Sequence, residues 1–337
     1  MPETPDSPPS TKPAFDPLIQ TENIAFSPDE LNACNACGRQ NPPYRTKCMY
    51  CGDELEIATE DLTQIKPIIR RMESWERGFN VILTGTTAGT DISIGRIASL
   101  ISQDATDVES ILKAETSMPL ARLESSRDAE IMIRGLAALG LICRTISDEY
   151  LAADKLPARL TGIEIGNGSI KLIDFNTRGG SEILFTELAL IIPGSLNQSR
   201  IDLVEKRRRK GPEVLDETES TAAEVILDLY SRSDAKGFRI QLAGFDFSCL
   251  GSEKGFLAAE NMSRLIKLLV RLAPNARVAD NYSSVKHLLA PVWEIEARRD
   301  AQGMKRLRFG KSGFGKTETT SNLQQFTKFS RLQWHLL

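Results

Sequence analysis

Four cysteines near the N-terminus have the type and the spacing that metal binding requires. They form two Cys-x-x-Cys pairs, Cys34 with Cys37 and Cys48 with Cys51, which are separated by ten residues. Two such pairs can present four thiolates to one tetrahedral ion, and Zn²⁺ is the usual occupant of such a site. Because sulfur would fill every coordination position, none would remain for water or substrate. The sequence therefore predicts one structural Zn²⁺ rather than a catalytic metal.

Two disulfides, or a redox Cys-x-x-Cys motif, are the alternatives for these cysteines. Disulfides need an oxidising compartment, and the opening sequence MPETPDSPPSTKP has no cationic start and no apolar run for export. Redox chemistry fits a single pair inside a βαβ unit better than two pairs at this separation. The spacing therefore favours zinc, and the opening sequence predicts a cytoplasmic protein.

The cysteine-containing segment, CNACGRQNPPYRTKCMYCGDEL, resembles the short zinc ribbons found at the ends of many bacterial proteins, including its Asn41-Pro42 pair. Its spacing is also similar to that of the Ran-binding type of zinc finger, which implies RNA binding. That family has a Trp two residues before its first Cys, where this chain has Asn32. The bacterial ribbon is the better match and implies a small zinc-binding module over residues 31–56.

Composition limits the remaining chemistry. The chain has 337 residues, 41% of them apolar and 26% charged, as expected for two or three soluble globular domains. A formal net charge of -3 gives no global attraction to nucleic acid or to an anionic membrane. No apolar run is long enough for a transmembrane helix. Cys143 and Cys249 lie in apolar runs, and the chain has only two histidines, so no Cys-His pair is indicated. No acidic pair is singled out as a general acid and base, and we predict a protein that is not an enzyme.

Composition and periodicity divide the chain into six segments. In order they are a flexible Pro-rich leader, the zinc ribbon, a linker, a compact α/β domain, a β-rich domain and a basic aromatic tail, over residues 1–30, 31–56, 57–78, 79–150, 155–292 and 293–337. The expected fold class is therefore multidomain α+β: a small zinc ribbon, a compact α/β domain, and an antiparallel β-rich domain closed by a C-terminal helix.

The α/β domain is predicted to have the element order β-α-α-β-α-β. A strand begins at Phe79, and a capping box formed by Thr106 and Glu109 starts the second helix. Ser125 or Ser126 caps the third helix.

This order, together with residues 119–123, 126–130 and 139–141, resembles the C-terminal domain of the bacterial ribosomal stalk protein, a fold shared with the Clp protease adaptors. In the stalk protein a Gly-Leu-Gly-Leu-Lys stretch helps to receive translation factors. The matching residues 104–109 read DATDVE. The resemblance therefore implies the fold but not the factor-binding role.

The β-rich domain is predicted from alternating apolar residues and turns. Gly166-Asn167-Gly168 separates two strands of a hairpin, and a long amphipathic helix follows the strands and ends at Pro274. The pattern of antiparallel strands and one closing helix is similar to a pleckstrin-homology-like barrel. A generic α+β sandwich has equal weight.

Two basic motifs also suggest chemistry. Residues 310–317, GKSGFGKT, match the phosphate-loop pattern G-x4-G-K-[ST], with Lys316 and Thr317 as its phosphate-binding and metal-binding positions. The pattern works only between a buried strand and a helix, and the following ETTSNLQQFTKFSRLQW shows no amphipathic helix, so we expect an accidental match. The second motif, KRRRK at 206–210, is expected to form a solvated loop between strands.

Three functions are compatible with these features. The first is a non-catalytic zinc-binding adaptor or scaffold that binds protein partners. The second is an RNA-binding or single-stranded-DNA-binding protein that uses the ribbon, the KRRRK loop and the basic aromatic residues from Arg298 to Leu337. A phosphate-loop NTPase is a remote third. The partner and the oligomeric state cannot be read from the sequence.

Overall fold

The protein is described here by a computed structural model. The described residues are 26–27, 31–43, 45, 47–56, 69–70, 72–73, 75–89, 92–208, 211–307 and 312–337. The predicted flexible leader lies outside the described residues except for 26–27, and so do residues 57–68 of the predicted linker. The chain divides into two compact units, Met1–Thr59 and Glu60–Leu337. The finer domain boundaries expected from the sequence stay a prediction.

The first unit contains the four-cysteine module. Its strands β1 (Asn32–Ala33) and β2 (Gln40–Asn41) pair antiparallel, and an isolated bridge joins Lys47 to Glu54. Among the described residues of the module, the hydrophobic core consists of Cys34, Cys48 and Leu55. So small a core cannot offset the entropy lost when the chain is ordered, so the module requires a further cross-link.

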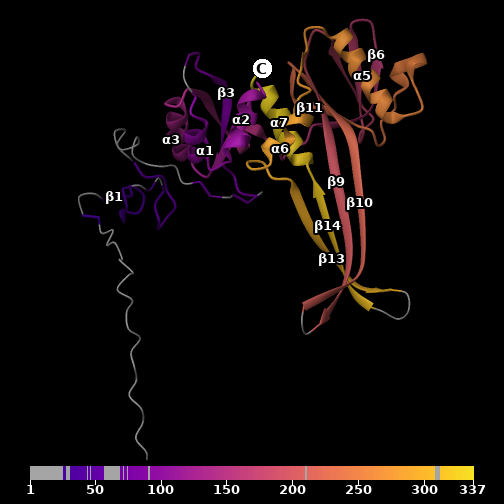
Figure 1. The fold of residues 1–337 in the computed structure, drawn as a ribbon. Helices are drawn as coiled ribbons and strands as arrows, with labels where there is room; N and C mark the ends of the chain where they lie inside the picture. The colour runs from indigo at the N-terminus through magenta and orange to yellow at the C-terminus, as the bar shows by residue number, and fades with distance from the viewer. Residues whose placement is uncertain are drawn as a thin grey trace, which may run out of the picture. The chain divides into compact units, whose positions relative to one another are not determined.

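The second unit begins with a small α/β module (Figure 1). Its elements are β3 (Phe79–Thr86), α1 (Ile94–Ile101), α2 (Ala105–Lys113), β4 (Met118–Leu123), α3 (Ser126–Ala137), β5 (Leu141–Ser147) and α4 (Asp148–Leu151). The strands are all antiparallel in the order β4-β3-β5. Helix α3 packs on β3 and β5 and also contacts α1. The predicted order β-α-α-β-α-β is confirmed.

The starts of two helices in this module test the predicted caps. Ser125 is the N-cap of α3, and its side chain accepts a hydrogen bond from the backbone N–H of Asp128, as predicted. Helix α2 instead begins after Asp104, whose side chain makes no capping bond, and Thr106 lies inside the helix. The predicted capping box at Thr106 and Glu109 is therefore wrong. The Glu109 carboxylate accepts a bond from Lys113 one turn later.

A nine-stranded sheet, three further α-helices and one 3-10 helix (η3) complete the described part of the unit. The elements are β6 (Ala158–Ile165), β7 (Ser169–Asp174), β8 (Gly180–Leu184), β9 (Leu188–Arg208), β10 (Gly211–Ser231), β11 (Asp234–Gln241), η3 (Ser248–Glu253), α5 (Ala258–Leu272), β12 (Arg277–Val278), α6 (Tyr282–Leu289), β13 (Glu296–Arg306), β14 (Ser312–Ser321) and α7 (Leu323–His335). The strand order is β13-β14-β9-β10-β11-β6-β7-β8, and β12 pairs with β9. The pairs β11–β6 and β12–β9 are parallel and the others antiparallel. The α+β class is confirmed, but the sheet is mixed rather than purely antiparallel.

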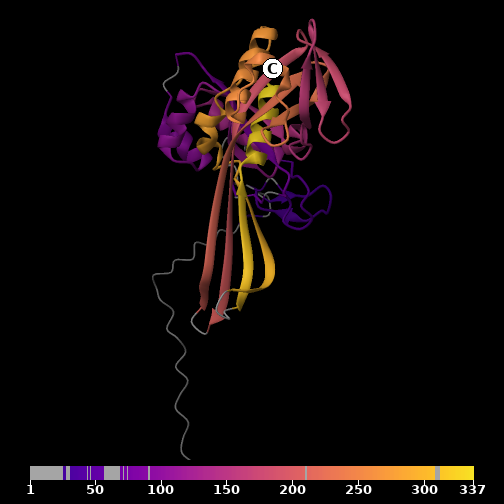
Figure 2. The same ribbon diagram turned by 90° about the vertical axis from the view of Figure 1, so that its right-hand side faces the viewer.

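Part of this sheet forms an arm that the sequence did not predict. This arm, which we call the β arm, consists of β13, β14, residues 197–208 of β9 and residues 211–223 of β10. The four strands run side by side (Figures 1 and 2). Residues 206–208 of the KRRRK run belong to strand β9, so the predicted loop is wrong for these residues, and 209–210 lie outside the described residues. Because most positions of the arm are exposed on both faces, its strands lack the apolar alternation by which strands are recognised.

The C-terminal residues form helix α7, which packs against β9. Phe326 and Phe329 of α7 are fully buried, so the expectation of no helix in this segment is wrong. The Phe326 ring lies against Gly194 of β9, where a side chain would place its Cβ 2.2 Å from ring atom Cε2. The absence of a side chain at Gly194 thus allows α7 to pack closely against the sheet.

A buried ion pair lies under the same helix. Arg239 of β11 donates two hydrogen bonds of 2.7 Å to the carboxylate of Asp228 on β10, and both side chains are buried. Ser330 of α7 donates to the same carboxylate at 2.7 Å, and its oxygen is 2.9 Å from the Tyr230 hydroxyl. The network links α7 to two strands of the sheet.

Candidate metal centre

The two Cys-x-x-Cys pairs have the same backbone geometry. In the first, Gly38 N–H donates to the carbonyl of Cys34 at 2.7 Å, and in the second, Gly52 N–H donates to the carbonyl of Cys48 at 3.0 Å. Both glycines have a positive φ, 70° at Gly38 and 78° at Gly52, which glycine adopts without strain. The sequence therefore forms two equivalent turns, each of which presents a pair of thiols.

The four sulfur atoms converge on one point. The Sγ atoms of Cys34, Cys37, Cys48 and Cys51 all lie within 4.8 Å of one another. The Cys34–Cys51 distance is 3.5 Å and the Cys37–Cys48 distance is 3.6 Å. These distances are too long for disulfides, whose S–S length is about 2.0 Å. Four sulfurs at about 2.3 Å from one tetrahedral ion would be about 3.8 Å apart. The arrangement thus fits a single metal ion.

Asn41 contacts the cysteine cluster and is completely buried. Its Nδ2 donates to the Cys48 sulfur at 3.5 Å and to the Arg39 carbonyl at 2.9 Å. Its Oδ1 accepts a bond of 2.8 Å from the backbone N–H of Met49. Both ends of the amide are therefore used to fix the second cysteine turn against the first. The sequence indicated Asn41 only as part of the ribbon resemblance and did not predict this contact.

The surroundings of Cys48 favour its thiolate form. Burial raises the pKa of the thiol, but hydrogen bonds donated by the backbone N–H groups of Tyr50 and Cys51 and by the Asn41 amide outweigh it and lower the pKa to about 6. The Tyr50 N–H lies 3.4 Å from the Cys48 sulfur. Because metals bind the thiolate rather than the thiol, these donors prepare Cys48 as a ligand at neutral pH.

The phosphate-loop residues occupy a different structural context from the one the motif requires. Ser312 to Thr317 lie on β14, between the antiparallel strands β13 and β9, and not at a helix N-terminus. Lys316 Nζ is 2.5 Å from Glu205 Oε2, and Thr317 donates to an oxygen of Asp202. Both side chains thus bond carboxylates on the neighbouring strand β9. Gly310 and Lys311 lie outside the described residues.

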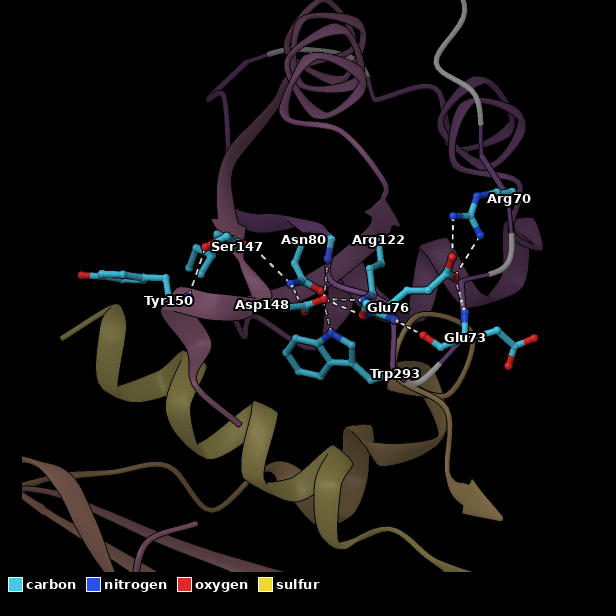
Figure 3. Close-up of polar contacts among 11 residues, drawn as sticks. Arg70, Glu73, Glu76, Asn80, Arg122, Ser147, Asp148, Tyr150 and Trp293 are labelled. Atoms are coloured by element: carbon cyan, nitrogen blue, oxygen red, sulfur yellow. Dashed lines mark hydrogen bonds and ion pairs between the residues drawn. The ribbon is translucent and has the colours of Figure 1, made fainter. Parts of the chain in front are cut away.

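A second polar cluster lies inside the larger unit, where the α/β module meets the segment before β13 (Figure 3). The Asp148 carboxylate accepts bonds of 2.8 Å from Arg122 Nε and from the Gly78 N–H. Asn80 donates to Asp148 at 2.8 Å and accepts from Trp293 Nε1 at 2.8 Å. Asn80 and Trp293 are buried. These groups satisfy one another, which gives the cluster a structural role in joining the module to the rest of the unit.

Comparison of the chain with family models, with curated proteins and with solved structures finds no match. Among the helices of the described residues, none combines the length and the apolarity needed to cross a membrane. The chemistry of the cysteine site is therefore the strongest guide to function.

Proposed function

We propose that this protein is a non-catalytic adaptor whose N-terminal zinc ribbon is held together by one Zn²⁺ bound to Cys34, Cys37, Cys48 and Cys51. The convergence of the four sulfur atoms carries the proposal. A site with four thiolates has no open position for a reacting molecule, so the metal acts on folding. The small buried core of the module agrees with this role, because the metal would supply most of its stability.

The resemblance to the ribosomal stalk and Clp adaptor fold supports an adaptor for residues 79–147. The element order from β3 to β5 agrees with that fold. Residues 104–109, where the stalk protein has its Gly-Leu-Gly-Leu-Lys stretch, include the acidic first turn of α2. We therefore propose a scaffold of this kind without the factor-binding surface.

Exposed apolar side chains support binding to a protein partner. Phe256 and the adjacent Leu257 precede α5, and the Phe256 side chain is fully exposed. Apolar side chains that are exposed next to each other are common in protein-binding surfaces. We propose that the pair contributes to the partner-binding surface of the adaptor.

Metal content tests the zinc assignment. We expect about one zinc per chain by mass spectrometry of untagged protein, and loss of that zinc in Cys48→Ser. Cys143→Ser is the matched control, because Cys143 lies on β5 outside the cysteine cluster and should leave zinc unchanged. Stoichiometric zinc in Cys48→Ser would show that the assignment is wrong.

Co-purification at low and high salt tests the adaptor role separately. Protein partners that survive high salt and are lost in Phe256→Ser/Leu257→Ser support it. Nucleic acid that washes off as salt rises supports the nucleic-acid alternative, because phosphate contacts depend on counterion release. Nucleotide binding that disappears in Lys316→Ala supports the NTPase alternative.

A further inference from the structure

Residues 205–208 of β9 and 312–314 of β14 are far apart in the sequence but lie at one end of the β arm. Phe314, inside the GKSGFGKT motif, pairs with Glu205, which precedes the KRRRK run. Beyond this pair, β9 ends at Arg208 and β13 ends at Arg306. Figures 1 and 2 show the four strands of the arm running to this end. Among the described residues, the fold therefore brings Lys206 to the same end of the arm as Lys305 and Arg306.

Exposed apolar side chains lie at the same end of the arm. Met304 pairs with Phe314, Phe314 with Glu205, and Glu205 with Val214, so the four residues form one row across the sheet. Residues paired in this way point to the same face. The exposed fractions of Met304, Phe314 and Val214 are 66%, 57% and 51%. Glu205, the acidic member of the row, is neutralised by Lys316 at 2.5 Å.

The basic side chains at this end are available for a ligand. Lys206 and Arg306 are exposed and Lys305 is half-buried. Within the part of the chain that the structure describes, none of the three makes an ion pair. Arg306 lies two positions after Met304 and shares the face of the apolar row, whereas Lys206 and Lys305 face the other side of the sheet. Cations and exposed apolar groups at one end of an arm match an anionic phospholipid surface, whose phosphates attract the charges while its acyl boundary accepts the apolar groups.

Protection of the arm's edges does not explain this composition. The free edges do carry protective features: acidic Glu217 and Glu219 on β10, basic Arg299 on β13, and bulges in both strands. Charges and bulges of this kind prevent edge-to-edge pairing of sheets. An exposed apolar row would promote association instead of preventing it, so it indicates a ligand.

We propose that the distal end of the β arm docks on an anionic phospholipid surface, with Met304, Phe314 and Val214 entering the interface. Single-stranded nucleic acid fits less well, because bases stack on aromatic rings and only Phe314 of the three apolar residues has one. The proposal does not depend on zinc or on the adaptor role.

Sedimentation of the full-length protein with vesicles tests this proposal. We expect binding to vesicles of equal parts phosphatidylcholine and phosphatidylglycerol, and much weaker binding to phosphatidylcholine alone. Lys206→Ala/Arg306→Ala should weaken binding about thirtyfold, since each cation near a charged surface contributes about fivefold. Arg298→Ala/Arg299→Ala removes the same charge nearer the base of the arm and should have a smaller effect.

A second set of variants tests the apolar row. Met304→Ser/Phe314→Ser/Val214→Ser should weaken binding on the order of fiftyfold. Each methylene-sized group that enters the interface contributes about fourfold, and each of the three residues loses at least one such group. Leu156→Ser/Leu184→Ser removes exposed apolar side chains outside the arm and should leave vesicle binding unchanged. Circular dichroism should show every variant folded, because all of the replaced apolar side chains are exposed.

Three outcomes would overturn the proposal. The first is no binding to anionic vesicles. The second is equal binding to both vesicle types. The third is tighter binding to a single-stranded oligonucleotide than to vesicles, if that binding is lost in Lys206→Ala/Arg306→Ala and unchanged in the triple serine variant. This result would assign this end of the arm to nucleic acid instead.

Discussion

The cysteine module and the larger unit reach a stable fold by opposite means. The module has three buried core residues and four converging thiols. The unit Glu60–Leu337 has two extensive hydrophobic clusters, one of which includes residues of the α/β module, α6 and α7. We therefore expect the first to depend on a metal and the second on apolar burial. Their difference implies that the two units can be destabilised independently, and substitutions in each test that independence.

Removal of the metal should have the largest effect and should be confined to the module. Structural zinc sites contribute about 10–16 kcal/mol of apparent binding energy, and a module of this size has no comparable source of stability. We expect a strong chelator to abolish hydrogen-exchange protection in residues 31–56 and to leave residues 79–337 protected. Mass spectrometry of exchanged peptides measures both regions in one experiment. Loss of protection across both units would contradict their independence.

Breaking the buried ion pair should have the converse effect. Asp228→Asn leaves the Arg239 guanidinium buried without its counter-charge, which costs about 3–5 kcal/mol. We expect this loss in the free energy of unfolding of the larger unit by denaturant titration, with zinc content unchanged. In Asp228→Leu/Arg239→Met no charge remains buried, so much of the stability should return. A single variant as stable as the parent would show that the pair is not buried in solution.

The cysteine cluster could be predicted from the sequence because it depends on local structure, namely two turns that are each formed by consecutive residues. The hairpin around Gly166-Asn167-Gly168 and the cap at Ser125 were readable for the same reason. Helix α7 was not, because its buried face carries polar groups as well as rings. Gln325 donates to the Trp293 carbonyl, and Ser330 bonds Asp228. Only the fold supplies these partners, so the helix lacks an apolar period in the sequence.

The β arm was missed for a different reason. Its strands have solvent on both faces, so the period of two that identifies a half-buried strand is absent. Asn41 is an intermediate case. Its position inside the ribbon could be seen, but its bond to the Cys48 sulfur depends on how the two turns pack.

Asn41→Ala should therefore weaken metal binding without abolishing it. Removal of a group that orients a metal ligand typically costs about 10–100-fold in affinity. We expect a decrease of that size in competition titrations with a chromogenic chelator. Asn32→Ala is the matched control, because Asn32 pairs with Asn41 across the ladder but, within the described part of the module, its amide bonds the Pro43 carbonyl and no cysteine sulfur. Equal losses in the two variants would mean that Asn41 acts through general packing rather than through the sulfur.

The smallest predicted effect distinguishes two serine or threonine positions that look alike in sequence. Ser125→Ala removes the side chain that caps α3 and should destabilise the larger unit by about 1 kcal/mol. Thr106→Ala, at the position where the sequence also indicated a cap, removes no capping bond and places a better helix former inside α2, so the free energy of unfolding should change by only a few tenths of a kcal/mol. Thermal or denaturant unfolding of both variants measures the difference. A loss at Thr106 equal to that at Ser125 would restore the capping box and move the start of α2.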